Sequence, residues 1–355
     1  MKASFFIVCT CTCIFYVLFY ARTINIWCYI HTTEFYPNRS VNSETMPEDE
    51  SGIPPVAFQM TAILATMLAG IAALVQIQTP TGSTQYLPCP KQQPWKYHYE
   101  IFCLKYTPIW IGCFAYIVAS QVYEKFNQWT YLFVCGGLAL PLLLQPLLYP
   151  ETTKQPIHAL YSFKANLWIA VFSFIGNYWY THYFYSVLKA SYSMPSHRLN
   201  NVPIPLYFAT HFYFSTYHVF SNVMIRVIST RYQSTTARRA LYILSIAAFS
   251  YFTAFMETLT ISSFPYYSFE DRHLAYTVGS AFYGIYFIVS FPMFFALDEK
   301  SMTCWDTLVH VCGCGMIVLC LLDFCRLALR ITLVVALSEE KRIVRCLNEN
   351  CHFLH

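Results

Sequence analysis

Long apolar runs are the feature that most constrains this chain. A transmembrane helix needs about 20 mostly apolar residues to cross the hydrocarbon core of a bilayer. The sequence therefore predicts an all-α protein, a polytopic transmembrane helical bundle of about seven core spans with one or two extra N-terminal hydrophobic segments. The candidate spans are 3–21, 56–77, 106–122, 129–149, 166–188, 204–228, 240–264, 274–296 and 306–330. The first of these runs also fits a cleaved signal peptide.

The composition agrees with a membrane protein. Charged residues make up 11% of the 355 residues, whereas soluble domains carry about 25%. The net charge of +4 is scattered along the chain, so we expect no nucleic-acid partner. The 15 cysteines form no C-x-x-C pair and indicate neither a disulfide framework nor a zinc site. We therefore expect no metal, and nothing in the sequence indicates an oligomeric state.

Changes in polarity along the chain divide it into four parts. Residues 1–55 combine an N-terminal hydrophobic segment with a polar linker, and residues 56–104 hold an extra span and a Pro-rich loop. Short loops then join the remaining spans, which predicts a membrane core over 105–337. Residues 338–355 form a polar tail. The positive charges do not fix the orientation of this bundle in the membrane.

Polar residues within the 166–188 span lie on one side of the predicted helix. At 100° per residue, Asn177, Tyr178, Thr181, His182 and Tyr185 occupy a sector of about 140°. Lipid cannot satisfy such groups, so we expect this sector to face the interior of the bundle.

Two further spans carry polar groups at membrane depth. In the 204–228 span, His211, Ser215, His218 and Asn222 form a single stripe. In the 240–264 span, Glu257 is a carboxyl group deep in an apolar run. Such a group costs about 2.5–3.5 kcal/mol near a helix centre, so it requires an explanation. Together these spans predict an aromatic chamber that contains histidines, amides and one carboxyl group.

A buried glutamic acid has a specific chemical use. A low dielectric disfavours the charged form of a carboxyl group, so Glu257 is expected to be neutral and to hold a proton. A general acid that acts on an apolar substrate needs that property. By contrast, Asp323 and Arg326 are expected to neutralise each other near a helix end, and the acids of DEK (298–300) to lie in a solvated loop.

Each of these polar groups also has a structural interpretation. The stripe of histidines could serve only to hold helices together, and tyrosines near span ends often anchor a helix at the interface. Three classes of function remain open: an acid–base enzyme acting on a lipid, a metal-dependent lipid oxidase or desaturase, and a non-catalytic binder or transporter. The sequence lacks the closely spaced histidines that a membrane di-iron site needs, which argues against the oxidase or desaturase class. Composition does not separate the first from the third.

Several motifs within the spans are more specific. They are GNYWYTHYF (176–184), NNVP (200–203), YHVFSN (217–222), METLTISSFPYY (256–267), DR (271–272), VGSAFYGIYFIVSFPMFF (278–295) and DEK (298–300). Together they resemble the cycloeucalenol cycloisomerase family, in order, over residues 100–330. Ser268 and Glu270 depart from the family pattern, which argues against a catalytic Glu270.

The resemblance implies an isomerase of sterol biosynthesis in the endoplasmic reticulum membrane. Such an enzyme opens the 9β,19-cyclopropane ring of a 4α-methyl sterol, converting cycloeucalenol to obtusifoliol, a Δ8 sterol. It needs no redox cofactor, because a proton enters at one carbon and leaves from another.

On this basis we assign candidate roles to residues that lie within matched motifs or at membrane depth. Glu257 is the candidate acid, and His182 or His218 the candidate base or proton relay. Asn177, Asn200 or Asn201 are candidates to hold the sterol 3β-hydroxyl. The other expected substrate-binding residues are Tyr178, Tyr180, Thr181, His211, Asn222 and Tyr251, of which the tyrosines would surround the cation.

Overall fold

Nearly all of the regular structure is helical, because backbone polar groups in lipid must be satisfied within each segment. The computed structural model describes residues 56–148, 156–262, 264–269 and 275–328. The predicted segments 1–55 and 338–355 and the DR motif at 271–272 lie outside these residues. The long helices are α2 (Val56–Gln76), α3 (Pro94–Ala119), α4 (Gln128–Leu148), α5 (Tyr161–Ile175), α7 (Ile204–Arg231), α8 (Thr236–Ser262), α10 (Ser280–Phe295) and α11 (Cys304–Ala328).

Shorter elements complete this part of the chain. Two π-helical turns, η3 (Gly176–Tyr180) and η4 (Ala275–Gly279), lead into α6 (Thr181–Val187) and α10. Short 3₁₀ helices lie before α4 and α5, at Val122–Lys125 (η1) and Ile157–Ala159 (η2). The strands are β1 (Ser191–Tyr192), β2 (Arg198–Leu199), β3 (Val202–Pro203) and β4 (Tyr267–Ser268).

Six helices in the described part of the chain are long and apolar enough to cross a membrane. They are Phe58–Gln76, Pro94–Ala119, Gln128–Leu148, Thr236–Thr260, Ala275–Phe295 and Cys304–Ala328. The protein is therefore a multi-pass membrane protein. The predicted spans 166–188 and 204–228 are also helical, but neither is among the six. The first is divided by η3, and the polar stripe of α7 lowers its hydropathy.

The predicted boundary between residues 104 and 105 falls inside α3. Pro94 occupies the first turn of this helix, where its missing N–H costs nothing and its fixed φ suits the helix. The aromatic sequence after the Pro-rich loop, WKYHYE (95–100), is consequently helical. It brings the Lys96 and Glu100 side chains into the bundle, where both are buried.

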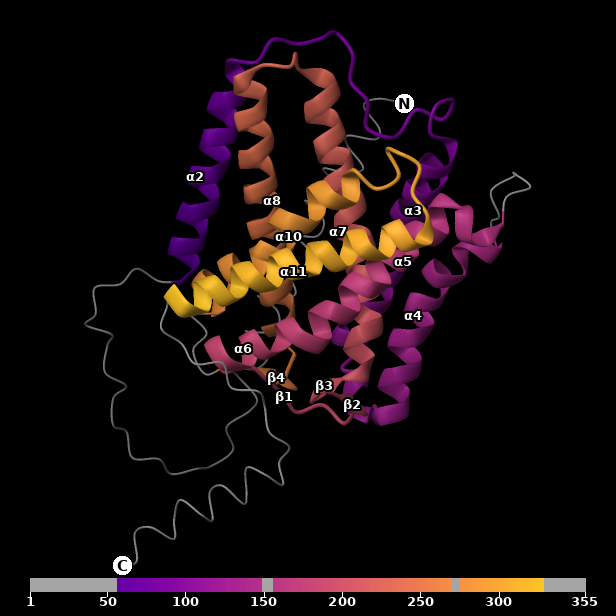
Figure 1. The fold of residues 1–355 in the computed structure, drawn as a ribbon. Coiled ribbons are helices and arrows are strands. Elements are labelled where there is room, and N and C mark those ends of the chain that lie inside the picture. Colours follow the sequence, from indigo (N-terminus) through magenta and orange to yellow (C-terminus); the bar gives the residue numbers. More distant parts are fainter. Residues whose placement is uncertain (1–55, 149–155, 263, 270–274, 329–355) are drawn as a thin grey trace, which may run out of the picture. The chain divides into compact units, whose positions relative to one another are not determined.

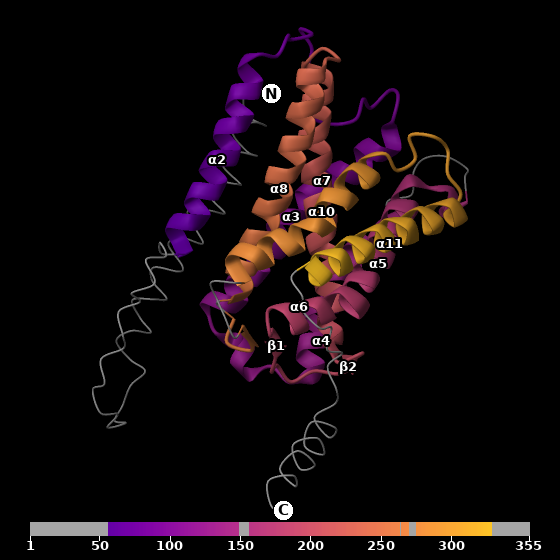
Figure 2. The ribbon, with the colours of Figure 1, turned by 60° about the vertical axis from the view of Figure 1, so that its left-hand side comes forward.

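The helices pack around α7, α8 and α10. Helix α8 packs against α2 and α10, and α11 lies across α5 and α10 (Figures 1 and 2). Helices α10 and α8 are in close contact at Gly284, where a Cβ atom would lie 3.6 Å from the Tyr251 Cα. Buried aromatic rings fill the space between α5, α7 and α10, including Trp168, Phe172, Phe287, Phe291 and Phe294.

Two short antiparallel ribbons cover one end of these helices (Figure 1). In the first, Ser191 pairs with Ser268 and Tyr192 with Tyr267. The second is a hairpin in which Asn200 and Asn201 have φ of 51° and 60°. Two positive φ values between paired strands suit the right-handed twist of a hairpin, and asparagine tolerates them better than most residues. The NNVP motif is therefore a hairpin turn.

Candidate active site

A cavity lies where η3, α6, α7, α8 and α10 meet the β1–β4 ribbon. Its free volume is about 70 Å³. Most of its wall is apolar or aromatic with a few polar groups, as is usual for small-molecule sites. The lining residues are Gly176, Asn177, Thr181, Phe184, Leu188, Tyr192, Thr210, Phe214, Glu257, Thr258, Tyr267, Phe269, Tyr283 and Tyr286.

Glu257 is the carboxyl group among these described lining residues. Its side chain is buried on α8, and its Oε1 accepts a hydrogen bond of 2.8 Å from the Tyr283 hydroxyl. Its Oε2 has no hydrogen-bond partner among the described residues, although the Tyr217 hydroxyl also interacts with the carboxyl group. A buried oxygen without a partner costs free energy. A role in chemistry or ligand binding would account for such an oxygen in a cavity wall.

Aromatic rings surround this carboxyl group. Tyr283 packs edge to face with Tyr286 and with Phe184, with ring centroids 4.8 and 5.4 Å apart. In the β1–β4 ribbon, Tyr192 stacks on Tyr267 at 4.3 Å. Burial raises the pKa of both ribbon phenols above the ordinary value, so both stay neutral at physiological pH. The faces of such rings attract cations.

The π-helical turn η3 forms another part of the wall. A π turn inserts an extra residue into a helix, and such turns are frequent at functional sites. Here the Asn177 Nδ2 donates to the Ser173 carbonyl and to the Thr210 Oγ1, each at 2.8 Å. The Thr181 Oγ1 donates to the Gly176 carbonyl at 3.3 Å. Asn177, Thr181 and Thr210 therefore form a second polar group in the cavity.

Of the predicted site residues, Glu257, Asn177 and Thr181 line the cavity. The three predicted tyrosines lie outside its lining. Tyr178 stacks on Phe174 at 5.4 Å, and the Tyr180 hydroxyl donates to the Gly315 carbonyl. Tyr251 faces α2, with its hydroxyl 3.5 Å from the Met60 Sδ.

The predicted residues of the NNVP hairpin also lie beside the cavity lining rather than in it. The Asn200 Nδ2 donates to the Tyr178 carbonyl at 2.6 Å, which ties the hairpin turn to η3. The Asn201 carbonyl accepts a hydrogen bond from Tyr185. His182 packs edge to face with Tyr185, and its imidazole also interacts with Asn200 of the hairpin turn.

The remaining predicted residues make hydrogen bonds deep in the bundle. His218 is fully buried: its Nδ1 lies 2.7 Å from the Phe214 carbonyl and its Nε2 lies 2.9 Å from the Ser290 Oγ. The carbonyl can only accept, so Nδ1 donates and Nε2 accepts. The His211 Nε2 contacts the Asn166 Oδ1 at 3.2 Å. The Asn222 Nδ2 donates to the Glu100 Oε1.

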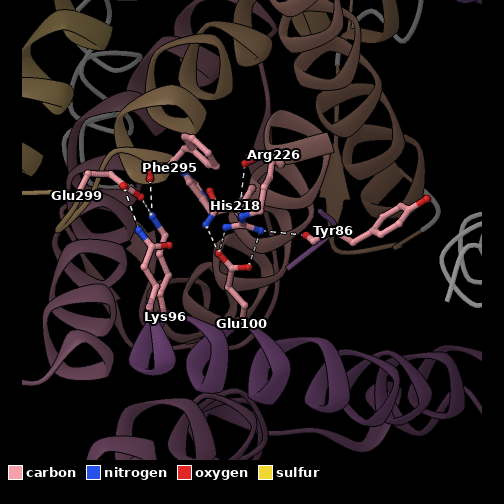
Figure 3. Close-up of polar contacts among 10 residues, drawn as sticks. Tyr86, Lys96, Glu100, His218, Arg226, Phe295 and Glu299 are labelled. Carbon is pink, nitrogen blue, oxygen red and sulfur yellow. Dashed lines mark hydrogen bonds and ion pairs between the residues drawn. The ribbon is translucent and has the colours of Figure 1, made fainter. Parts of the chain in front are cut away.

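Charged residues on α3, α5 and α7 and in the segment after α10 form separate ion pairs, several of which are shown in Figure 3. Arg226 donates to both oxygens of Glu100, at 2.8 and 2.9 Å, and to the Tyr86 carbonyl. Lys96 donates to Glu299 and to the Phe295 carbonyl, each at 2.6 Å. Lys164 pairs with Asp298 at 2.7 Å. Glu299 and Lys300 are exposed, as expected of a solvated loop, but Asp298 and Glu299 also pair with two buried lysines, which the sequence did not predict.

Sequence reasoning missed several residues of the cavity. Tyr283 and Tyr286 lie in the VGSAFYGIYFIVSFPMFF motif, and Tyr267 lies in the aromatic FPYYSF turn. The density of aromatic residues was the available signal. The pairing of Tyr192 with Tyr267, and the contact of Thr210 with Asn177, depend on tertiary structure that periodicity does not show. No group of His, Cys, Asp and Glu able to hold a metal ion occurs in the part of the chain that the structure describes.

Comparison with known proteins adds independent information. A cycloeucalenol cycloisomerase from Arabidopsis thaliana is 44% identical over 238 residues, which cover 65% of this chain and 85% of that protein. No family model matches the chain, and no solved structure matches it. At this identity and coverage the relationship is plain. The chain belongs to the cycloeucalenol cycloisomerase family and is an isomerase.

Proposed function

We propose that this protein opens the 9β,19-cyclopropane ring of cycloeucalenol to give obtusifoliol, with Glu257 as the proton donor. One observation carries the proposal. The Glu257 carboxyl group lines the cavity, and its Oε2 is buried without a direct hydrogen-bond partner among the described residues. A neutral carboxyl group in such surroundings can donate a proton to a hydrocarbon. The name of the Arabidopsis relative supplies the substrate.

The first step is protonation of the strained ring. The electron pair of the C9–C19 bond takes the Glu257 proton at C19, which becomes a methyl group, and a tertiary cation forms at C9. The rings of Tyr283, Tyr286 and Phe184 lie around the carboxyl group. A desolvated aromatic face stabilises a cation by about 2 kcal/mol or more, and that stabilisation appears only as charge develops.

The second step is loss of the C8 proton, which forms the C8–C9 double bond. The carboxylate that remains on Glu257 is a base that already lines the cavity, so it can accept this proton and regain its neutral form. This step requires the C8 hydrogen to lie on the same face as the opened ring. His182 is the alternative acceptor, because it lies on α6, which also carries the lining residues Thr181 and Phe184. His218 would first have to break one of its two hydrogen bonds.

The cavity also suggests how the sterol is held. Asn177 and Thr210 provide polar groups for the 3β-hydroxyl. The free volume of about 70 Å³ is well below the roughly 300–1,000 Å³ of a typical ligand pocket. Sterol entry therefore requires lining residues to move. The β1–β4 ribbon can move most easily, because only two pairs of residues join its strands.

Conversion of substrate is the test of this function. Membranes from cells that express the protein, supplied with cycloeucalenol and no added cofactor, should form obtusifoliol, measured by mass spectrometry. Cells in which the gene is deleted should accumulate 9,19-cyclosterols, and a tagged protein should co-localise with an endoplasmic reticulum marker. Sterol binding without conversion, together with an unchanged sterol profile after deletion, would favour a sterol-binding or transport protein instead.

A further inference from the structure

The two oxygens of the Glu257 carboxyl group have different surroundings. Oε1 accepts a 2.8 Å hydrogen bond from the Tyr283 hydroxyl. Oε2 is buried and has no direct hydrogen-bond partner of its own among the described residues, although the Tyr217 hydroxyl also interacts with the carboxyl group. A neutral carboxyl group has one carbonyl oxygen, which accepts, and one hydroxyl oxygen, which donates. Donation by Tyr283 favours Oε1 as the carbonyl oxygen, which is the better acceptor, and leaves Oε2 to carry the transferable proton.

Rigid packing holds Tyr283 in place. Its ring contacts Phe184, Tyr286 and Phe287, with centroids 5.4, 4.8 and 5.2 Å away. At the next residue, Gly284, α10 is in close contact with α8, the helix that carries Glu257. The Tyr283 hydroxyl therefore reaches Oε1 from a ring with little freedom to move, and it fixes the direction in which the carboxyl group points.

The same hydrogen bond has a second effect once the proton has left. The carboxylate is then a charged acceptor, and a hydrogen bond to a charged group is stronger than one between neutral groups. The Tyr283 hydroxyl therefore stabilises the state that follows proton transfer more than the state that precedes it, which lowers the barrier.

We propose that Tyr283 is a positioning residue for ring opening: it occupies Oε1 of Glu257, presents the protonated Oε2 to the cyclopropane, and stabilises the carboxylate that forms. This inference rests on the proposed function, because it assigns Tyr283 a role through the acid. Tyr283 itself need not contact the sterol to perform this role.

Infrared spectroscopy of the resting protein tests the contact directly. The carboxylic C=O band that Glu257→Gln removes belongs to Glu257. We expect that band to move to higher frequency in Tyr283→Phe, because its carbonyl oxygen loses a donor. Tyr106→Phe is the matched control: it removes a tyrosine hydrogen bond of the same 2.8 Å length, to the Leu138 carbonyl, and should leave the band unmoved.

Kinetics provide the second measurement. Tyr283→Phe should lower kcat by about ten- to a hundredfold, which corresponds to one hydrogen bond to a charged group, and leave KM within about twofold. Tyr106→Phe should leave both constants within about twofold. A merely structural role for Tyr283 would lower the amount of folded enzyme without this separation of kcat from KM.

The possible outcomes separate the two claims. If Glu257→Gln removes no carboxylic band, the neutral acid of the proposed function is wrong, and this inference is wrong with it. If the band exists but neither its frequency nor kcat responds to Tyr283→Phe, only the role of Tyr283 is wrong. Should Tyr283→Phe fail to fold, the wild-type band decides: it should lie below that of an unbonded carboxylic acid in an apolar solvent, and an equal or higher frequency contradicts the contact.

Discussion

Glu257 and His218 are both buried titratable residues, yet their hydrogen bonds give them different capacities. Both nitrogens of His218 are engaged, by the Phe214 carbonyl and the Ser290 hydroxyl, and aromatic rings enclose its imidazole. Glu257 keeps one oxygen without a partner among the described residues. At the scale of single residues, these surroundings support the proposal that Glu257 rather than His218 transfers the proton, because His218 is packed into the core.

Substitution of the two histidines distinguishes these roles. We expect the activity of His182→Gln, per folded protein, to lie within about tenfold of the wild-type activity. In the proposed mechanism the Glu257 carboxylate, not His182, takes the C8 proton. His218→Gln should lower the thermal unfolding midpoint, since it disrupts two buried hydrogen bonds. Rates of obtusifoliol formation, normalised to folded protein, provide the measurement. General bases contribute about 10²–10⁴-fold, so a loss of that size in His182→Gln would make His182 the acceptor.

Asn177 permits a test of substrate orientation. If its amide holds the 3β-hydroxyl, Asn177→Ala should lower kcat/KM by about tenfold, the value of one hydrogen bond. With the wild-type protein, a substrate analogue that lacks the hydroxyl should have a kcat/KM about tenfold lower than that of the substrate. With the variant, the kcat/KM values of substrate and analogue should be almost equal. Equal losses with both proteins would show that another residue binds the hydroxyl.

At the scale of helices, α11 supports the π turn of the site. The Tyr180 hydroxyl donates to the Gly315 carbonyl, so Gly315 lies against η3. A Cβ atom at Gly315 would lie 2.9 Å from the Ile175 Cδ1 and 3.1 Å from the Tyr180 hydroxyl. Gly313, half a turn earlier on the same helix, has nothing within 4 Å of such an atom. The two glycines form a matched pair for testing this support.

Gly315→Ala should therefore move α11 away from η3. We expect a destabilisation of about 1–3 kcal/mol, as for other overpacked sites, and lower activity because Asn177 shifts with the turn. Gly313→Ala should change neither property. Thermal unfolding in detergent and the conversion assay measure both effects, and equal behaviour of the two variants would show that α11 does not hold the turn.

Helix positions could be predicted from the sequence far better than helix interruptions. The apolar runs at 129–149 and 274–296 match α4 and the η4–α10 segment to within a residue or two. Apolar length alone determines such segments. The π turn at Gly176–Tyr180 was not predicted, because a single extra residue in a helix leaves almost no trace in periodicity. The start of α3 was missed because its first turns carry Lys96 and Glu100, which are polar but buried by partners on other helices.

At the scale of the whole molecule, the cavity and the buried Glu100–Arg226 pair lie in separate parts of the described structure. Cavity residues on α7 include Thr210 and Phe214, whereas Arg226 lies near the other end of that helix. At 1.5 Å per residue, Phe214 and Arg226 are separated by about 18 Å along the axis. The Glu100–Arg226 pair joins α3 and α7 away from the cavity.

Glu100→Gln tests this separation. It leaves Arg226 buried with its counter-charge removed, so we expect a loss of about 3–5 kcal/mol in the free energy of unfolding with little change in kcat per folded protein. Asp323→Asn is the control: Asp323 is 41% exposed and pairs with Arg326, so its pair contributes at most about 1 kcal/mol. A large fall in kcat for Glu100→Gln in folded protein would contradict the separation.

The sequence predicted an aromatic chamber with a buried carboxyl group, but only some of the residues that line the candidate site. Glu257 was identified because a carboxyl group deep in an apolar run is costly, and Asn177 and Thr181 because they lie on the polar side of one helix. Tyr283 and Tyr192 approach Glu257 from segments distant in sequence, and tyrosine is too common in this chain for any one to stand out. The polar stripe on α7 was identified correctly as buried, but His218 and Asn222 contact other helices rather than the cavity.

The claim on which the account depends is that Glu257 donates the proton, and the rate of obtusifoliol formation by Glu257→Gln tests it most directly. The amide has nearly the same size but no transferable carboxylic proton, so we expect at least a hundredfold loss of rate with folding preserved. Glu124→Gln, which alters an exposed carboxyl group in η1, should retain the wild-type rate. Near wild-type conversion of cycloeucalenol by Glu257→Gln would contradict the account.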